Sequence, residues 1–270
     1  MRARGVARPS RAFLSPRVAL IVAGVLLLCG TVSAFMVFRP RLTRAERGLR
    51  LAERTGCFAC HGPEGTRGTS NPGRNDGSVP NFEGDVMMFA DSADEIRQWI
   101  RDGATAKRSR SQTWREERKR GVLKMPAFKR RLTDAQISDL VAYVEAVTGQ
   151  PEPEDSLAKR GLERAEALGC VGCHGPGGRL GRPNPGSLKG FIPTWGGPDF
   201  PELVRNRDEF GEWVQRGRTR RFERNRLASF FLDRAVLRMP AYREHLAPGD
   251  LESLWAYVEW LRSLPLSARD

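Results

Sequence analysis

The pattern C-x-x-C-H occurs twice in this chain, at residues 57–61 and 170–174. Residues three apart share one face of a helical turn, so both thiols of each motif can form thioethers to the two vinyl groups of one porphyrin. The histidine that follows them can ligate the iron. The chain has only 3 histidines, and two of them follow its only two C-x-x-C pairs. Chance is therefore a poor explanation, and the motifs predict two covalently attached haem c groups.

Two other uses of paired cysteines fit the chain less well. A zinc ribbon separates its cysteine pairs by about 15 to 20 residues, whereas here they lie 110 residues apart (170 minus 60). A thioredoxin-like dithiol lies in a βαβ setting, but neither motif is flanked by runs of β-branched or aromatic residues. We therefore predict the haem attachment residues to be Cys57, Cys60, Cys170 and Cys173, and the iron ligands that follow them to be His61 and His174.

The chain also contains an internal duplication. RGLRLAERTGCFACHG aligns with RGLERAEALGCVGCHG at an offset of 113 residues (170 minus 57), and an Asn-Pro-Gly sequence recurs at the same offset. Further on the offset is 114 (213 minus 99), which pairs Trp99 with Trp213 and Tyr143 with Tyr257. Such a repeat predicts two tandem modules, residues 45–149 and 156–265. The acidic, proline-rich segment 150–155 is predicted to be the linker.

Each module is predicted to be helical. Thr133 and Gln136 form a capping-box pattern, apolar residues follow at helical spacing, and Gly149 stops the run. The second module closes on a similar apolar run from Leu251 to Leu261. Between the cysteines and these helices lie the Gly- and Pro-rich stretches 62–80 and 175–198, which indicate loops wrapped around something other than protein.

A recurring methionine is the candidate for the second axial ligand of each iron. LKMPAF and LRMPAY occupy the same place in the two modules and contain Met125 and Met239. Met87 and Met88 have no methionine counterparts in the second module. A thioether is a soft ligand that favours ferrous iron and raises the reduction potential. A methionine in an apolar stretch more commonly serves packing, but the recurrence favours ligation by Met125 and Met239.

With these motifs, the chain resembles the class I c-type cytochromes over nearly all of both modules. The resemblance implies an all-α fold, with two tandem cytochrome c domains in which an N-terminal haem-binding helix crosses a C-terminal helix. These crossings would pair Gly48 with Tyr143 and Gly161 with Tyr257.

The resemblance also assigns a role to two prolines. Pro80 in VPNF and Pro193 in IPTW would offer their carbonyl groups to the two motif histidines, which would hold each ring in its ligating tautomer. The alternative is that both prolines lie in ordinary loop turns.

Two long basic segments, residues 103–125 and 218–238, depart from the compact family pattern. A solvated helix surface is the interpretation that we favour for both segments. The alternative is a pair of extra helices packed beside the haem, with Trp114, Phe230 and Phe231 as core anchors and the arginines as a docking face.

Residues 18–38 contain no charge and are numerous enough to cross a bilayer as a helix. We interpret them as a single-pass membrane anchor that follows a basic cytoplasmic tail, residues 1–17. A cleaved signal peptide is the alternative. Arginines flank the run on both sides, so charge does not decide its orientation. The family resemblance implies that the haem domains lie outside a bacterial cytoplasmic membrane, in the periplasm.

These features predict an electron carrier rather than an enzyme: a dihaem protein that transfers electrons between redox partners in a respiratory chain. The formal net charge of +13 favours acidic protein partners and anionic lipid over nucleic acid. The alternative is a dihaem oxidoreductase such as a cytochrome c peroxidase, in which one iron would use another histidine. His245 is the only spare one, and we expect it on the surface. A haem-based sensor would need an output domain, which we do not expect.

Overall fold

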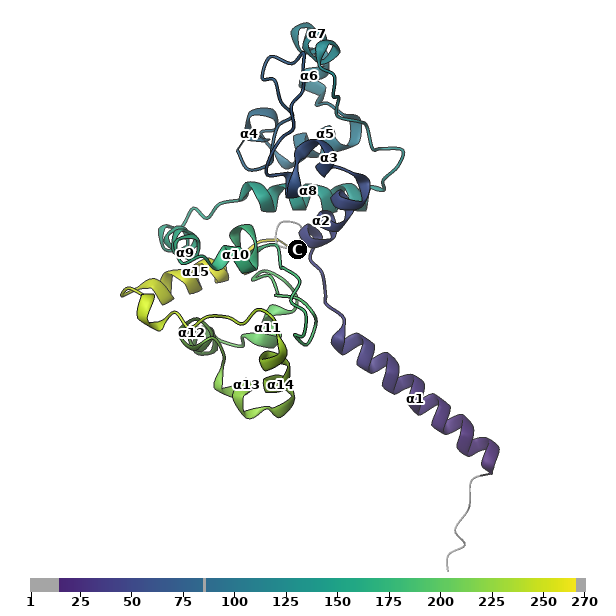
Figure 1. Cartoon of the computed structure of the whole chain (residues 1–270), viewed down its shortest axis with the longest axis vertical. Coiled ribbons are helices and arrows are strands. Elements are labelled where there is room, and N and C mark those ends of the chain that lie inside the picture. The colour runs from purple at the N-terminus through teal and green to yellow at the C-terminus, as the bar shows by residue number, and fades with distance from the viewer. Residues whose placement is uncertain (1–14, 85, 266–270) are drawn as a thin grey trace, which may run out of the picture. The chain divides into compact units, whose positions relative to one another are not determined.

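The computed structural model describes residues 15–84 and 86–265 of the chain (Figure 1). Over these residues the regular elements are all helices, and extended pairing is limited to two isolated bridges, Ser70 with Ser78 and Pro183 with Phe191. This agrees with the predicted all-α class. The chain divides into two compact units, the first ending at Arg39 and the second beginning at Pro40.

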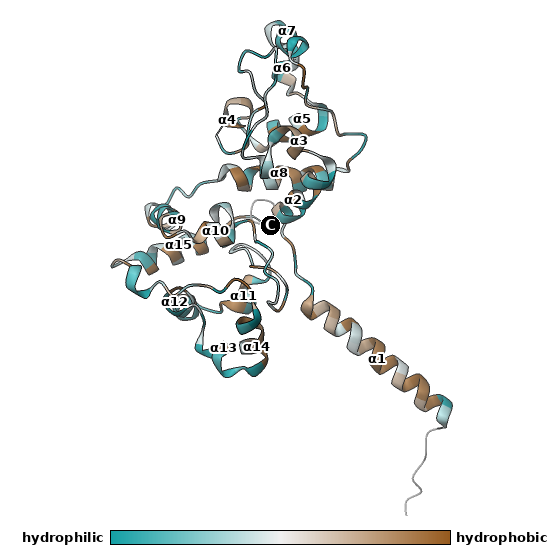
Figure 2. Ribbon diagram, in the orientation of Figure 1, coloured by the Kyte–Doolittle hydropathy of each residue, from teal (hydrophilic) through white to brown (hydrophobic). Residues whose placement is uncertain are grey.

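The first unit contains one long apolar helix, α1 (Pro16–Phe38). Ser15 caps its N-terminus and Pro16 takes the first position, where a missing N–H costs nothing. None of its residues is buried, and Figure 2 shows it apolar along nearly its whole length. Its 23 residues correspond to about 34 Å, enough for a bilayer core of about 30 Å. The helix can therefore be a membrane anchor or a signal sequence. Residues 1–14 of the predicted basic tail lie outside the described residues.

The first half of the second unit, residues 40–149, is built on two crossing helices. α2 packs against α8, and α5 packs against α8 beside it. The apolar side of α8 fills the core between them, with Ile137, Leu140 and Val141 almost fully buried. The helices of this half are α2 (Arg44–Thr55), α3 (Phe58–His61), η1 (Pro63–Gly65), α4 (Val86–Phe89), α5 (Ala93–Asp102), α6 (Ala106–Arg110), α7 (Gln112–Arg120) and α8 (Asp134–Thr148).

The second half, residues 156–265, repeats this order of elements and adds the short helix η3 before its last helix. α9 packs against α15 as α2 packs against α8, and α12 also contacts α15. Leu254, Val258 and Leu261 of α15 are buried in its core. The helices are α9 (Ser156–Ala167), α10 (Cys170–His174), η2 (Pro176–Gly178), α11 (Phe200–Leu203), α12 (Arg207–Arg216), α13 (Arg220–Arg224), α14 (Arg226–Arg234), η3 (Arg243–His245) and α15 (Asp250–Ser263).

Glycines allow the close helix crossing in both halves. A Cβ at Gly48 of α2 would collide with the Asp139 carbonyl and with Tyr143 of α8. A Cβ at Gly161 of α9 would collide in the same way with the Ser253 carbonyl and with Tyr257 of α15. The predicted crossings of Gly48 with Tyr143 and of Gly161 with Tyr257 are confirmed.

The basic segments form short helices, α6 with α7 and α13 with α14. Trp114 is buried at 7% exposure and contacts the Trp99 ring at 5.8 Å, as expected of a core anchor. Phe231 is half-buried. Phe230 is 50% exposed, with the Arg234 guanidinium over its ring, so the alternative that made it a core anchor is wrong. The reason is helical geometry: because Phe231 faces inward, its neighbour Phe230 points about 100° away.

Part of the second half packs into the first. Leu180, just after η2, is 2% exposed and belongs to the apolar cluster of α2, α5 and α8. Arg179 donates to the Pro151 carbonyl at 2.6 Å and to the Gln150 carbonyl, and Arg182 pairs with Glu64 at 2.6 Å. We call residues 179–182 the seam. The prediction that stretch 175–198 wraps only around a non-protein group is wrong for Leu180, which packs against protein.

Candidate haem sites

Each C-x-x-C-H motif of the second unit lines a cavity of its own. The first cavity, of about 230 Å³, is lined by Cys57, Cys60, His61 and Met125 together with apolar side chains of α5 and α8. The second, of about 420 Å³, is lined by Cys170, Cys173, His174 and Met239. The structure thus brings the eight residues nominated from sequence together in two sets of four, one set in each half.

Both motif histidines are held by a proline carbonyl. His61 Nδ1 lies 2.8 Å from the Pro80 oxygen, and His174 Nδ1 lies 3.1 Å from the Pro193 oxygen. Because a carbonyl only accepts, Nδ1 carries the proton, and Nε2 is left with a lone pair that can bind a metal. Burial lowers the pKa of both imidazoles, against a smaller opposing effect of these hydrogen bonds. The predicted contacts of both histidines with the proline carbonyls are confirmed, and the lowered pKa favours the neutral imidazole, which is the form that can bind a metal.

An aromatic ring and a tyrosine hydroxyl support each motif. The Phe82 ring centroid lies 4.7 Å from that of His61, and the Trp195 centroid lies 5.1 Å from that of His174. Tyr143 donates to the Glu64 carbonyl just after the first motif at 2.8 Å. Tyr257 makes the corresponding bond to Gly177, also at 2.8 Å. The supporting rings were missed from sequence, although an aromatic residue two positions after Pro80 and Pro193 is a recurring signal.

The environment of Cys57 and Cys170 differs from that of a redox dithiol. Burial raises the pKa of the Cys57 and Cys170 thiols, whereas a dithiol active site depends on a lowered thiol pKa. Across the part of the chain that the structure describes, no three His, Cys, Asp or Glu residues form a cluster that could hold a metal ion. The raised thiol pKa values therefore argue against the dithiol alternative.

An asparagine ties each methionine loop to the haem side of its half. Asn71 Oδ1 accepts from the Leu123 N–H at 2.8 Å, and Asn71 Nδ2 donates to the Leu123 carbonyl at 3.0 Å. Asn184 makes both bonds to Leu237, each at 2.9 Å. Leu123 and Leu237 precede Met125 and Met239 by two residues. The recurrence of Asn-Pro-Gly was visible in the sequence, but this function of the asparagine was not.

The walls of both cavities fit a haem. The surface of each cavity is mostly apolar, as a porphyrin ring requires. Arg74, Arg118 and Lys124 also line the first cavity and can offset the negative charge of the haem propionates. Two thiols, an oriented imidazole and a thioether complete a donor set that suits covalent haem c.

The comparison with known families agrees with this donor set. The family model of cytochrome c matches residues 45–148, which includes the first cavity. Searches of curated proteins and of solved structures give no significant match. Residues 45–148 are therefore a cytochrome c domain, which supports a c-type cytochrome with covalently bound haem c and a function in haem-based electron transfer.

Proposed function

We propose that the chain is a membrane-anchored dihaem electron-transfer protein in which each half of the second unit binds one haem c. The observation that carries the proposal is the repeated site: cysteine pair, histidine, proline carbonyl, asparagine and methionine occur around both cavities. When bound, each haem iron supplies reversible one-electron transfer.

The second half qualifies as a second cytochrome c domain because its internal hydrogen bonds repeat those of the first. Trp99 Nε1 donates to the Phe89 carbonyl at 2.9 Å, and Trp213 Nε1 donates to the Leu203 carbonyl at 3.0 Å. Both bonds tie the helix that lines the cavity to the short helix before it. The same supporting geometry with the same ligand set argues for the same cofactor.

We assign the axial ligands as His61 with Met125, and His174 with Met239. Both methionines are half-buried and pack against the apolar cluster of their own half. Gly103 and Gly217 have φ of 74° and 73°, and a Cβ at either would meet the carbonyl of the corresponding methionine. These contacts fix the methionine backbone beside the cavity. A thioether held in this way raises the reduction potential of its iron.

We further propose that α1 is a single-pass anchor in a bacterial cytoplasmic membrane and that both haem domains face the periplasm. The electron donor and acceptor would be redox proteins of a respiratory chain with acidic surfaces. The basic last turn of α7 and the exposed apolar side chains of Val122, Leu227 and Val236 suit such partners, because interfaces combine apolar contacts with complementary charge.

His245 argues against a peroxidase-like enzyme. It lies exposed in η3, as expected from sequence, and it is not among the residues that line either cavity. With histidine and methionine on each iron, neither haem would keep an open position for substrate. The electron carrier is thus the better-supported function.

The proposal is tested by intact mass and by redox spectroscopy of the purified membrane protein. We expect the mass of the polypeptide plus two haems, and the near-infrared band of methionine-ligated ferric haem. Met125→Leu and Met239→Leu should each remove part of that band, whereas Met88→Leu, at a side chain 66% exposed, should leave it unchanged. One haem, or carbon monoxide binding to the unmodified protein at native pH, would contradict the proposal.

A further inference from the structure

The wall of the second cavity contains residues from the first half of the unit. Leu42 and Glu46 line it, together with Pro40 and Arg41, although these residues precede the first C-x-x-C-H motif in the chain. Glu46 lies in the first turn of α2, and the other end of the same helix contributes Ala52 and Thr55 to the first cavity. α2 thus joins the two sites.

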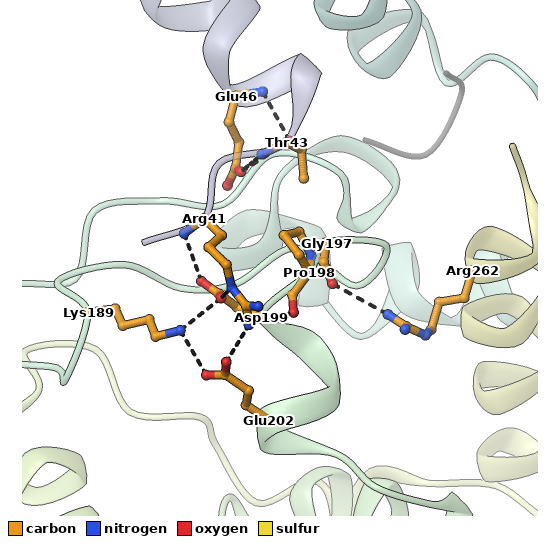
Figure 3. Close-up of polar contacts among 9 residues, drawn as sticks. All are labelled: Arg41, Thr43, Glu46, Lys189, Gly197, Pro198, Asp199, Glu202 and Arg262. Atoms are coloured by element: carbon orange, nitrogen blue, oxygen red, sulfur yellow. Dashed lines mark hydrogen bonds and ion pairs between the residues drawn. The ribbon is translucent and has the colours of Figure 1, made fainter. Parts of the chain in front are cut away.

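A charged cluster holds this segment against the second half, as Figure 3 shows. The Arg41 N–H donates to Asp199 Oδ2 at 3.1 Å, and Arg41 Nε donates to Asp199 Oδ1 at 2.6 Å. Lys189 Nζ lies 2.8 Å from both Asp199 and Glu202, and Arg41 also pairs with Glu202. The acidic groups of this cluster therefore have cationic partners.

Glu46 differs from Asp199 and Glu202, because the groups that donate hydrogen bonds to it are neutral. It is 4% exposed, and Oε2 accepts from the Thr43 N–H at 2.7 Å and from the Thr43 hydroxyl at 3.1 Å. The Gly181 backbone also bonds to it, and Arg50 is a cation close enough to act on it. Arg50 itself lies over the Phe191 ring, which lines the second cavity. Burial raises the pKa of Glu46, and these bonds and Arg50 oppose that rise.

The first cavity has no equivalent of this residue. At the offset of 113 residues (170 minus 57), the position of Glu46 is taken by Lys159 in the second half. Among the described residues that line the first cavity there is no aspartate or glutamate. A buried carboxylate is therefore a feature of the second site alone.

We propose that Glu46, which belongs to the first half, sets the reduction potential of the haem in the second half through its charge. This inference rests on the proposed dihaem function. A carboxylate in the cavity wall favours the more positive, oxidised iron, and the apolar surroundings weaken the interaction less than water would. Glu46 thus lowers the potential of the second haem below the value that this haem would have without the charge, and it makes two sites with matching ligands inequivalent.

Glu46→Gln separates the charge of this residue from its structural role. Glutamine can make the same capping-box bond to the Thr43 N–H, so the variant keeps the start of α2 while it loses the negative charge. Glu53→Gln is the matched control, since Glu53 lies in the same helix with an exposed side chain. Urea unfolding of both variants checks that stability is retained.

The measurement is a redox titration of the holoprotein over a range of pH that starts above 4.5, the ordinary pKa of a glutamate. Met125→His, made in parallel, changes the spectrum of the first haem and so identifies the second. In the unmodified protein the potential of the second haem should fall with rising pH as Glu46 loses its proton. In Glu46→Gln this potential should be higher and less dependent on pH, with the first haem unchanged and Glu53→Gln like the unmodified protein.

In Glu46→Gln, an equal shift in the reduction potentials of both haems, or no shift for the second haem at any pH, would overturn the inference. An intact mass that includes two haems would still support the dihaem function. A mass with fewer than two haems would instead reject the dihaem function itself.

Discussion

Asn71 and Asn184 show how single residues decide whether a methionine stays beside its cavity. Both side chains are buried, at 2% and 6% exposure, and each satisfies a donor and an acceptor of a loop that has no regular secondary structure of its own. The sequence repeat revealed the positions but not this role, because the two bonds cross 52 residues of chain in the first half and 53 in the second.

Asn71→Ala should destabilise the first half by about 1 to 3 kcal/mol, because two hydrogen bonds are lost and the Leu123 groups lose their partner. The methionine-ligated band of the first haem should also disappear at a lower denaturant concentration than in the unmodified protein. Denaturant titration followed in the near-infrared and by circular dichroism measures both effects. Asn75→Ala is the control, since Asn75 is exposed; equal losses in the two variants would contradict the role of Asn71.

Gly48→Ala tests the helix crossing in the first half. The added Cβ would meet the Asp139 carbonyl and Tyr143, both in rigid parts of α8, so α2 must move away. The free energy of unfolding should fall by about 1 to 3 kcal/mol, as for other overpacked cores. Gly211→Ala in α12 is the opposite case: a Cβ there meets only the end of Gln215, and alanine should gain up to about 1 kcal/mol. Urea unfolding of both variants gives the comparison.

For single helices, hydrophobic periodicity and capping patterns predicted the bounds correctly where the local sequence decides the structure. Thr133 and Gln136 form the expected capping box at the start of α8, and Gly149 ends the helix in a left-handed conformation. The short helices α4 and α11 were not foreseen, because four residues are too few for a periodic signal. The alternative that placed Phe230 in the core failed for a related reason: in a nine-residue helix, composition cannot tell which of two adjacent aromatics faces the core.

The pairing of α9 with α15 predicts an acid-sensitive contact. Asp250, at the start of α15, accepts from Arg164 Nε at 2.9 Å and from Arg164 Nη2 at 2.8 Å, and these bonds are the main cause of an Asp250 pKa below its ordinary value of 3.8. A lowered folded-state pKa means that the stabilisation is present above 3.8 and is lost as pH falls through the folded value.

Asp250→Asn should therefore lower the free energy of unfolding near neutral pH, and the difference from the unmodified protein should shrink as pH falls below 3.8. Urea unfolding of the whole protein at several pH values, followed by a signal from the second half, measures this convergence. Glu252→Gln is the control, since Glu252 also lies in the first turn of α15 but makes no such pair with Arg164. A difference that stays constant with pH would show that the loss in Asp250→Asn is not electrostatic.

At the scale of the whole molecule, the two halves are similar in sequence and yet joined by residues that the repeat does not share. Leu180 corresponds to Arg67 at the offset of 113 residues (170 minus 57), and Arg179 corresponds to Thr66. Glu64, which pairs with Arg182, has φ of 51°, where its counterpart Gly177 has φ of 56°. A glutamate is strained in this conformation, and the seam gives a physical reason for it. Aligning the two halves could not reveal the seam, because Arg179, Leu180 and Arg182, which make its contacts, differ from their counterparts in the first half.

Leu180→Ala should destabilise the first half although the substituted residue belongs to the second. The side chain is 2% exposed in a cluster with residues of α2, α5 and α8, so its truncation leaves a cavity there and should cost about 2 to 5 kcal/mol. Hydrogen exchange separates the halves: amides of Ile137 and Leu140 should exchange faster, and those of Leu254 and Val258 should change less. Arg67→Ala, at the exposed counterpart, should be close to neutral. If the amides of α15 alone lost protection from exchange, Leu180 would be stabilising its own half. That result would contradict the role of the seam in stabilising the first half.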